Sequence, residues 1–198
     1  MKTSSDARDR IVREAVRLFA ERGYDRTSVP DIQEAAGLSP GSGALYKHFP
    51  SKKALLATAV ERFIEAAHES HEELARNKAP DQGARWIVEN MLEKLSAHRE
   101  VLRILWRDLA QFPDLQAATR SEVMQATYRG VAAWLKQRQE LGDLRPHDSE
   151  AMATIIVGSI AMFRVFEATW GERAIKISDE RFISAWLELV ARGLGNQR

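Results

Sequence analysis

The stretch from Thr27 to Lys53, TSVPDIQEAAGLSPGSGALYKHFPSKK, decides how this chain folds. Ser28 is a favourable helix N-cap, and Pro30 is tolerated in a first helical turn, where N–H groups lack intrahelical partners. Apolar residues then recur at helical spacing until Gly37, which is expected to end the helix in a left-handed conformation. The stretch therefore opens with a short, well-delimited helix.

A second short helix is predicted to carry Leu45 and Phe49 one turn apart on its buried face. Pro50 stops this helix, and Ser51 caps a longer one that follows. Two short helices with glycine in the turn between them are typical of the helix-turn-helix, whose second helix lies in the DNA major groove. The stretch therefore predicts a DNA-binding fold.

This region resembles the DNA-binding domain of the tetracycline-repressor (TetR) family of bacterial regulators. The joint occurrence of the Ala-Ala-Gly-Leu-Ser turn, Leu-Tyr-x-His-Phe and Ser-Lys at these spacings is highly specific, and it covers roughly the first quarter of the chain. The matching residues are Phe19, Gly23, Tyr24, Thr27, Ile32, Ala35, Ala36, Gly37, Leu38, Ser39, Gly41, Leu45, Tyr46, His48, Phe49, Ser51, Lys52 and Leu55.

The resemblance implies an all-α fold with about nine helices. Residues 1–51 would form an N-terminal three-helix helix-turn-helix DNA-binding domain. Residues 52–198 would form a C-terminal helical domain for effector binding and dimerisation. The remainder of the chain fits the family only in its length and its all-helical character.

The segment Pro40-Gly41-Ser42-Gly43 departs from the family pattern. Gly37 and Tyr46 are nine steps apart, whereas the family usually has two fewer. Two extra residues inside a helix would rotate everything after them by about 200° and turn its buried face out of the core. We therefore expect the turn to be wider, with the second helix starting at Ser42 in preference to Ser39.

Small and polar residues line the exposed side of the second helix and its entry turn, where side chains can reach phosphates and base edges. Helix N-termini add free N–H groups and a favourable dipole for phosphate. For Thr27 the alternative is a purely structural cap, and for Tyr46 it is partial burial. The predicted DNA-contact residues are Thr27, Ser39, Gly41, Ser42, Gly43, Tyr46, Lys47, His48 and Lys52.

Composition narrows the functional classes. Cysteine is absent, which excludes disulfides, thiol redox sensing, cysteine nucleophiles and cysteine-based zinc sites. Residues 1–56 hold ten basic and seven acidic side chains, and the remainder holds nineteen and twenty-one. A mildly basic head on a mildly acidic body suits a DNA-binding module joined to a domain that does not bind DNA.

The sequence predicts a cytoplasmic protein. The N-terminus lacks the basic-then-apolar pattern of a signal peptide. The longest nearly uncharged run, Ala151 to Phe163, is too short for a membrane span of about 20 apolar residues. We therefore expect no membrane partner.

Helical periodicity continues through the rest of the chain, and no segment alternates with a two-residue period, so no sheet is expected. Charged residues interrupt the apolar faces of two of these helices: Arg103, Arg107 and Asp108 in one, and Arg164 and Glu167 in the other. A buried charge needs a partner. We expect these residues to pair internally, with anchoring of a polar ligand group as the alternative. The further helices are predicted at 5–22, 52–76, 81–97, 99–111, 113–141, 149–170 and 179–194.

Aromatic residues and methionines of the C-terminal helices are candidates to line a ligand cavity, because apolar clefts between bundle helices are common ligand sites. Ordinary core packing is the alternative for each of them. The predicted ligand-binding residues are Trp86, Met91, Trp106, Phe112, Tyr128, Met162, Phe163 and Phe166.

The helices at 149–170 and 179–194 carry more apolar residues than one-sided packing needs. Two such helices from each of two copies would make a four-helix bundle with two-fold symmetry. The alternative is that the first of them lies in the core of its own chain. The predicted dimer-interface residues are Ile156, Ile160, Phe182, Trp186 and Leu189.

No cofactor, metal or catalytic residue is expected. The spacing of His68, His71 and Glu72 can hold a metal, but a solvated helix face is our interpretation. The chain shows no P-loop, dinucleotide fingerprint or HExxH motif.

The function predicted from the resemblance is that of a homodimeric transcriptional regulator bound to a near-palindromic DNA operator. In its most specific form it is a repressor released from the operator by a small apolar or amphipathic ligand. A DNA-binding regulator without a small-molecule effector and an all-helical enzyme are the alternatives.

Overall fold

The computed structural model describes residues 3–75 and 79–195. This part of the chain contains no β-strand, and an isolated antiparallel bridge joins Leu144 to Gly195, which confirms the all-α prediction. The chain divides into two compact units, residues 1–64 with 99–117 and residues 65–98 with 118–198. This division differs from the predicted boundary between residues 51 and 52: it falls inside one long helix and assigns residues 99–117 to the first unit.

The first unit is built on α1, which packs against α2 and α5. Its core is formed by apolar residues at helical spacing, and Phe19, Leu45 and Phe49 are among its largest fully buried or nearly fully buried side chains. Its elements are α1 (Thr3–Arg22), α2 (Val29–Ala35), η1 (Leu45–Lys47), the first part of α3 (Lys52–Ala75), α5 (Arg99–Asp108), η2 (Leu109–Gln111) and the start of α6 (Pro113–Ala118).

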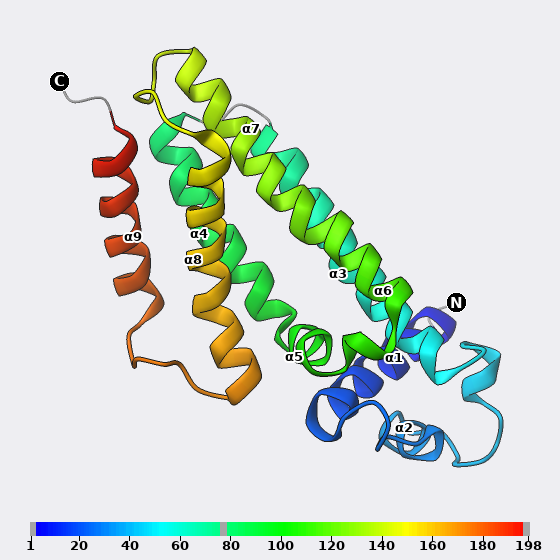
Figure 1. The fold of residues 1–198 in the computed structure, drawn as a ribbon. Helices are drawn as coiled ribbons and strands as arrows, with labels where there is room; N and C mark the ends of the chain where they lie inside the picture. Colours follow the sequence, from blue (N-terminus) through cyan, green and yellow to red (C-terminus); the bar gives the residue numbers. More distant parts are fainter. Residues whose placement is uncertain (1–2, 76–78, 196–198) are drawn as a thin grey trace. The chain divides into compact units, whose positions relative to one another are not determined.

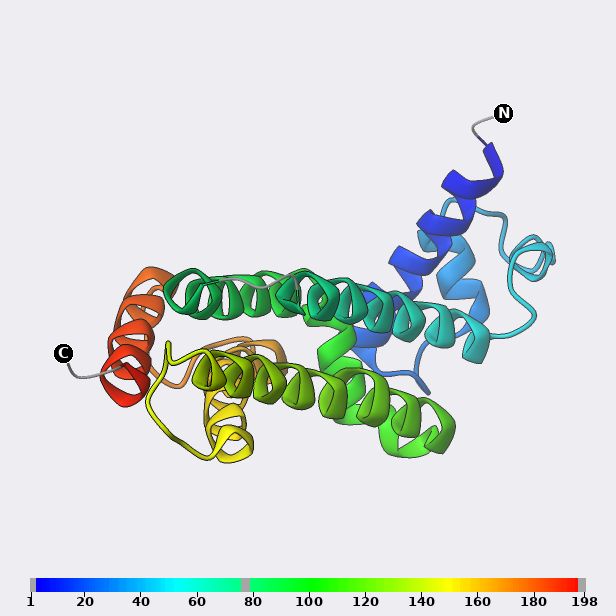
Figure 2. The ribbon, with the colours of Figure 1, turned by 90° about the horizontal axis from the view of Figure 1, so that it is seen from above.

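The second unit is a bundle in which α8 packs against α7 and α4, and α9 packs against α4 (Figures 1 and 2). Its elements are the end of α3, α4 (Pro80–Ala97), η3 (Thr119–Gln125), α7 (Ala126–Glu140), α8 (Ser149–Trp170) and α9 (Asp179–Leu194). The described helix α8 is long and apolar enough to cross a membrane by length and composition. Here it is a packed bundle helix, with Ile156, Val157 and Ile160 buried.

Local sequence signals set most helix ends. The Ser28 hydroxyl accepts from the Asp31 N–H while the Asp31 carboxylate accepts from the Ser28 N–H, so the two residues form a capping box at the start of α2. Asp148 is the N-cap of α8, because its side chain accepts hydrogen bonds from the backbone N–H groups of Glu150 and Ala151. Gly171 ends that helix with a φ of 81°. The predicted end of the long helix at Arg76 lies outside the described residues.

One prediction about helices is wrong. The second helix of the helix-turn-helix is one 3₁₀ turn at Leu45–Lys47 and starts at neither Ser39 nor Ser42. Gly41 and Gly43 before it have φ of 75° and 67°, a left-handed geometry that does not continue a right-handed helix. The chain is helical throughout the predicted range from Pro113 to Glu140, with π-helical geometry at Thr119–Gln125 between α6 and α7.

Helices α4 and α7 approach closely at one glycine. A Cβ built on Gly83 would lie 2.2 Å from the Trp134 Cζ2 atom, far inside van der Waals contact. Both residues are buried in the second unit. The missing side chain at position 83 therefore makes room for the indole ring.

Candidate functional site

The turn between α1 and α2, residues 23–28, is buttressed by polar contacts and is called the platform turn below. Thr27 is fully buried, and its hydroxyl donates to the carbonyl oxygens of Gly23 at 2.8 Å and Leu18 at 3.3 Å. The Lys52 Nζ atom donates to the Tyr24 and Thr27 carbonyl oxygens at 2.8 and 2.9 Å. It also lies 4.1 Å from the centre of the Tyr24 ring.

These contacts give two of the predicted DNA-contact residues a structural role. The Thr27 side chain is fully buried, and its hydroxyl donates to the carbonyl oxygens of Gly23 and Leu18, which agrees with the structural alternative. The Lys52 ammonium joins the start of α3 to the platform turn. Lys52 is half-buried, and its contact with DNA stays a prediction.

Two side chains of helix α5 also form hydrogen bonds with the platform turn and with the end of α1. The Arg107 guanidinium donates to the carbonyl oxygens of Phe19 and Ala20 at the end of α1. Asp108 is buried, pairs with Arg107 at 2.9 Å, and accepts from the Tyr24 N–H at 3.2 Å. The internal pairing expected for these two charges is therefore present.

Residues 37–48, called the reading segment below, form a loop that contains one 3₁₀ turn (Figure 2). Its three glycines, Gly37, Gly41 and Gly43, have positive φ. The Gly41 N–H donates to the side-chain Oε1 of Gln33 on α2 at 2.9 Å. Leu45 is fully buried, so the widened turn keeps the predicted apolar anchor inside the core.

The reading segment presents most of the predicted DNA-contact residues on its surface. Tyr46 is 56% exposed and Lys47 is also exposed, whereas His48 is half-buried. Ser42 donates through its hydroxyl to the Ser39 carbonyl at 2.6 Å, which tightens the loop. Ser39, Gly41 and Ser42 are exposed, and Gly43 is half-buried.

Gln33 positions this surface, a role that was not predicted from the sequence. Its side chain is 1% exposed, and it follows the fully buried Ile32 on the same helix. A polar residue within the buried part of a helix needs hydrogen-bond partners, and this was the available signal. Arg10 was also missed in this role: its Nε donates to the Ala36 carbonyl at 2.8 Å and joins α1 to the end of α2.

The eight predicted ligand-binding residues lie in different surroundings within the described part of the chain. Phe112 packs its ring edge-on against Tyr24 in the first unit, with centroids 4.7 Å apart, and Trp106 is 62% exposed. Met162 is exposed, and Phe166 stacks on Trp170 with centroids 4.8 Å apart. Trp86, Met91, Tyr128 and Phe163 pack against the core of the second unit.

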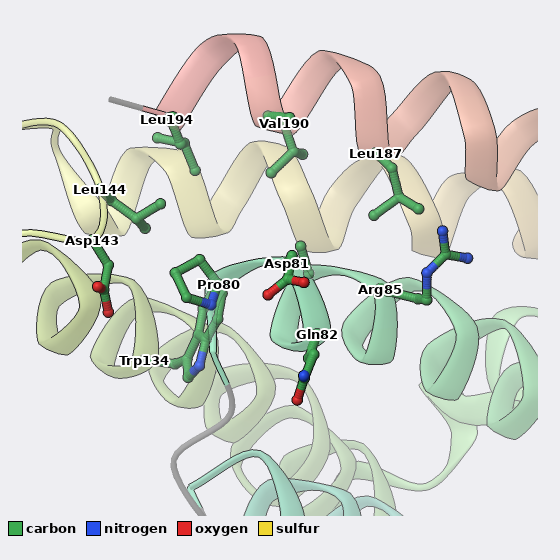
Figure 3. A pocket seen from close by; sticks show the side chains of 13 residues that line it. Pro80, Asp81, Gln82, Arg85, Trp134, Asp143, Leu144, Leu187, Val190 and Leu194 are labelled. Atoms are coloured by element: carbon green, nitrogen blue, oxygen red, sulfur yellow. The ribbon is translucent and has the colours of Figure 1, made fainter. Parts of the chain in front are cut away.

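A cleft of about 460 Å³ opens between α4, α9 and the loop after α7. Figure 3 shows Pro80, Asp81 and Arg85 on one side and Leu187 and Val190 on the other. The indole of Trp134 and the side chain of Leu144 complete its wall. The cleft is therefore mainly apolar, with Asp81 and Arg85 as charged groups along α4.

A second groove of about 500 Å³ lies between α7 and the start of α8. It is more polar: Arg129 and Lys136 line one side, and Ser149 and Thr154 line the other. Tyr128 is the member of the predicted ligand-binding set that lines it.

The predicted dimer-interface residues divide between the inside and the surface of the protomer. Ile156, Ile160 and Trp186 are 2%, 0% and 5% exposed and belong to the core of their own chain. This was the alternative for the helix that carries Ile156 and Ile160, and it was not considered for Trp186. The Trp186 Nε1 donates to the Ser159 hydroxyl at 3.0 Å, which joins α9 to α8. Phe182 is half-buried, and Leu189 is 67% exposed.

A charged cluster fixes the connection from α8 to α9. Arg164 is buried and pairs with Glu167 and Asp179, and Arg173 pairs with the same two carboxylates. Hydrogen bonding from Arg164 lowers the pKa of Asp179 below its usual range. Phe182 stacks on Phe163 beside this cluster, with ring centroids 4.0 Å apart.

The histidines on α3 make contacts with the helices beside them. The His71 Nε2 atom lies 2.9 Å from the Thr127 hydroxyl, and burial lowers the pKa of His71. His68 lies 3.3 Å from Glu122. Among the described residues, no cluster of three or more potential metal ligands is found.

Comparison with known proteins identifies the family. Residues 11–59 match the family model described as bacterial regulatory proteins, tetR family. Residues 85–184, half of the chain, match the model described as the C-terminal domain of AefR-like transcriptional repressors. YerO, an HTH-type transcriptional regulator of Bacillus subtilis (strain 168), is 30% identical over 104 residues, which are 51% of this chain and 35% of YerO.

Solved structures share the fold along nearly the whole chain. A putative transcriptional regulator from Saccharomonospora viridis, in complex with choline, has a TM-score of 0.76 at 22% identity, covering 98% of this chain and all of that one. AibR, in complex with isovaleryl coenzyme A and operator DNA, has a TM-score of 0.71 at 19% identity, covering 92% and 97%. The head motif, the two family models and the shared fold agree, and the chain belongs to the TetR family of bacterial helix-turn-helix transcriptional regulators.

Proposed function

We propose that this chain is a homodimeric repressor that binds a near-palindromic DNA operator and is released by a small apolar or amphipathic ligand. The observation that carries the proposal is that one compact unit contains both a platform turn held by side-chain hydrogen bonds and an exposed reading segment. Tyr46 and Lys47 stand out from this segment, and their neighbours are small residues that let a DNA backbone come close. A phenol and an ammonium group are suited to phosphate oxygens and base edges.

The proposed dimer uses the exposed side of α8 and α9. Ile155 and Leu189 are 58% and 67% exposed, so each helix keeps apolar side chains that its own chain does not cover. Pairing these two helices with their copies would bury them in a two-fold bundle and place two reading segments on successive major grooves. Cytoplasmic location follows from this role.

The proposed effector site is the apolar cleft of the second unit. Its volume of about 460 Å³ and its lining of Trp134, Leu144 and Val190 suit a small apolar or amphipathic molecule. Two solved structures of the same fold are complexes with choline and with isovaleryl coenzyme A, which supports a small-molecule ligand for this chain. A ligand weakens DNA binding by its differential affinity for the two conformers. A filled cleft without ligand response would favour the regulator without an effector.

Selection of bound sequences from a random DNA library tests the DNA-binding part of the proposal. The wild-type protein is expected to enrich a near-palindromic motif. The double variant Tyr46→Ala/Lys47→Ala should enrich nothing at ordinary salt while keeping the wild-type unfolding midpoint, because both side chains are exposed. Enrichment of the same motif by the double variant would refute the assignment of the reading segment.

The oligomeric state tests the proposed interface. Leu189→Arg should give monomers in analytical ultracentrifugation, because it places a charge in the centre of an apolar contact. Glu188→Arg is the matched control, since residue 188 is exposed and already pairs with Arg192 along the same helix. A dimer that is unaffected by Leu189→Arg would show that the interface lies elsewhere.

A further inference from the structure

Gln33 holds the reading segment by one end of its side-chain amide. Its Oε1 atom accepts from the Gly41 N–H at 2.9 Å, in the middle of the widened turn. This bond fixes the orientation of the amide, because the opposite orientation would set its NH₂ group against another N–H donor. The sequence difference that distinguishes this head, the longer turn, is therefore fastened directly to α2.

The other end of the same amide is unused. The Gln33 Nε2 atom is buried and has no hydrogen-bond partner, and the residue as a whole is 1% exposed. Oε1 and Nε2 are bonded to the same carbon atom, so the free donor lies close to the hydrogen bond that holds Gly41. Buried donors without partners are rare in native proteins, and each one calls for a reason.

The reading segment beside this donor carries three glycines in left-handed geometry. Gly37, Gly41 and Gly43 all have positive φ, and a Cβ added at any of them would meet nothing within 4 Å. A chain of small residues without side-chain packing can shift by a small rotation of its backbone, and it lets a phosphodiester come close. Lys47 in the same segment would draw the DNA backbone towards this place.

We propose that Gln33 is a DNA-contact residue of this protein: its carbonyl oxygen holds Gly41, and its NH₂ group donates to a phosphate oxygen of the bound duplex. The inference rests on the proposed DNA-binding function and adds a residue and a chemical partner to it. A phosphate oxygen is the acceptor that the bound operator supplies at this segment, and it satisfies the donor that the free protein leaves unpaired.

Three variants separate the two ends of the amide. Gln33→Met keeps the size of the side chain and removes both hydrogen bonds. Gln33→Glu keeps the oxygen acceptor for Gly41 but replaces the donor with a negative charge. Gln116→Met is the matched control, because Gln116 is exposed on α6 of the same unit and no DNA contact is assigned to it.

Operator affinity is measured for each variant over a series of salt concentrations. Gln33→Met is expected to weaken binding about ten-fold to a hundred-fold, since it removes a hydrogen bond to a charged group. The slope of affinity against salt should stay at the wild-type value, because a neutral amide releases no counterion. Gln33→Glu should weaken binding at least as much while the Gly41 amide keeps its hydrogen-exchange protection, and Gln116→Met should bind as the wild type does.

Nuclear magnetic resonance of the wild-type protein supplies a readout that does not depend on how a variant folds. The side-chain NH₂ signals of Gln33, assigned by their absence in Gln33→Glu, should shift when operator is added. Signals that stay in place, or Gln33→Glu binding with wild-type affinity, would overturn the inference. Failure of the wild-type protein to bind any duplex would instead overturn the proposed function itself.

Discussion

The platform turn and the reading segment lie one helix apart in the same unit, yet they are held in opposite ways. In the platform turn Gly23 and Thr27 are buried, and the turn is fastened by Thr27, Lys52, Arg107 and Asp108, which bond to its backbone or to the end of α1. The reading segment is largely exposed and joins α2 through Gln33. The comparison teaches that this head separates support from recognition: one turn fixes the angle between helices, and the other stays adaptable at the surface.

The largest expected effect comes from breaking the platform turn at Asp108. Asp108→Ala leaves the Tyr24 N–H without its acceptor and Arg107 without its carboxylate, which should lower the free energy of unfolding by about 2–3 kcal/mol. Urea denaturation measures this change. Asp114→Ala is the control, because the Asp114 side chain is 86% exposed and its ion pair with Lys53 should contribute less than about 1 kcal/mol. Equal effects of the two substitutions would show that the platform turn is not the point of support.

An intermediate loss of folding stability is expected at Lys52 and not at the neighbouring lysines. Lys52→Met removes two hydrogen bonds to carbonyl oxygens and should cost about 1–3 kcal/mol of stability. Lys53→Met on the exposed side of the same helix should change stability little.

Lys47→Met tests the reading segment in the same way that Lys52→Met tests the platform turn. It should leave the unfolding midpoint unchanged and lower operator affinity, with a shallower salt dependence because one phosphate contact is lost. Loss of stability in Lys47→Met, or none in Lys52→Met, would contradict the division of roles.

The smallest effect concerns the cap that starts α2, between the two turns. Hydrogen bonds from Ser28 lower the pKa of Asp31 below its ordinary value of 3.8. A carboxyl with a lowered folded-state pKa stabilises the fold above its unfolded-state pKa, and this contribution is lost as the pH falls through the folded-state pKa.

Ser28→Ala removes the N-cap hydroxyl of α2 and should cost about 1 kcal/mol near neutral pH. The stability difference from the wild type should shrink as the pH falls below 3.8, because Asp31 becomes protonated. Thermal unfolding across a pH series measures it. In Asp31→Asn, which removes the titrating group, the effect of Ser28→Ala should not vary over this pH range.

Sequence predicted the helices well where local chemistry decides them. The cap at Ser28, the end of α8 at Trp170 and the bounds of α9 all follow from residues next to the helix end. It failed at the reading segment, since the choice between helix and loop there depends on whether Gly41 and Gly43 take left-handed geometry.

The faces of helices were harder to predict than their ends. Ile156 and Trp186 have the spacing of an interface, but periodicity does not distinguish a partner chain from a neighbouring helix of the same chain. Phe112 was assigned to the C-terminal domain because of its place in the sequence, whereas its contact with Tyr24 joins residues far apart in the chain. Long-range packing of this kind leaves no local signal.

The close approach of Gly83 and Trp134 also has an optical consequence. The same indole that fills the space beside Gly83 lines the apolar cleft, so a molecule entering the cleft must change the surroundings of a chromophore already built into its wall. The protein thus carries its own fluorescent indicator of occupancy, and the difference between the spectra of the wild type and Trp134→Phe isolates that signal from the other four tryptophans.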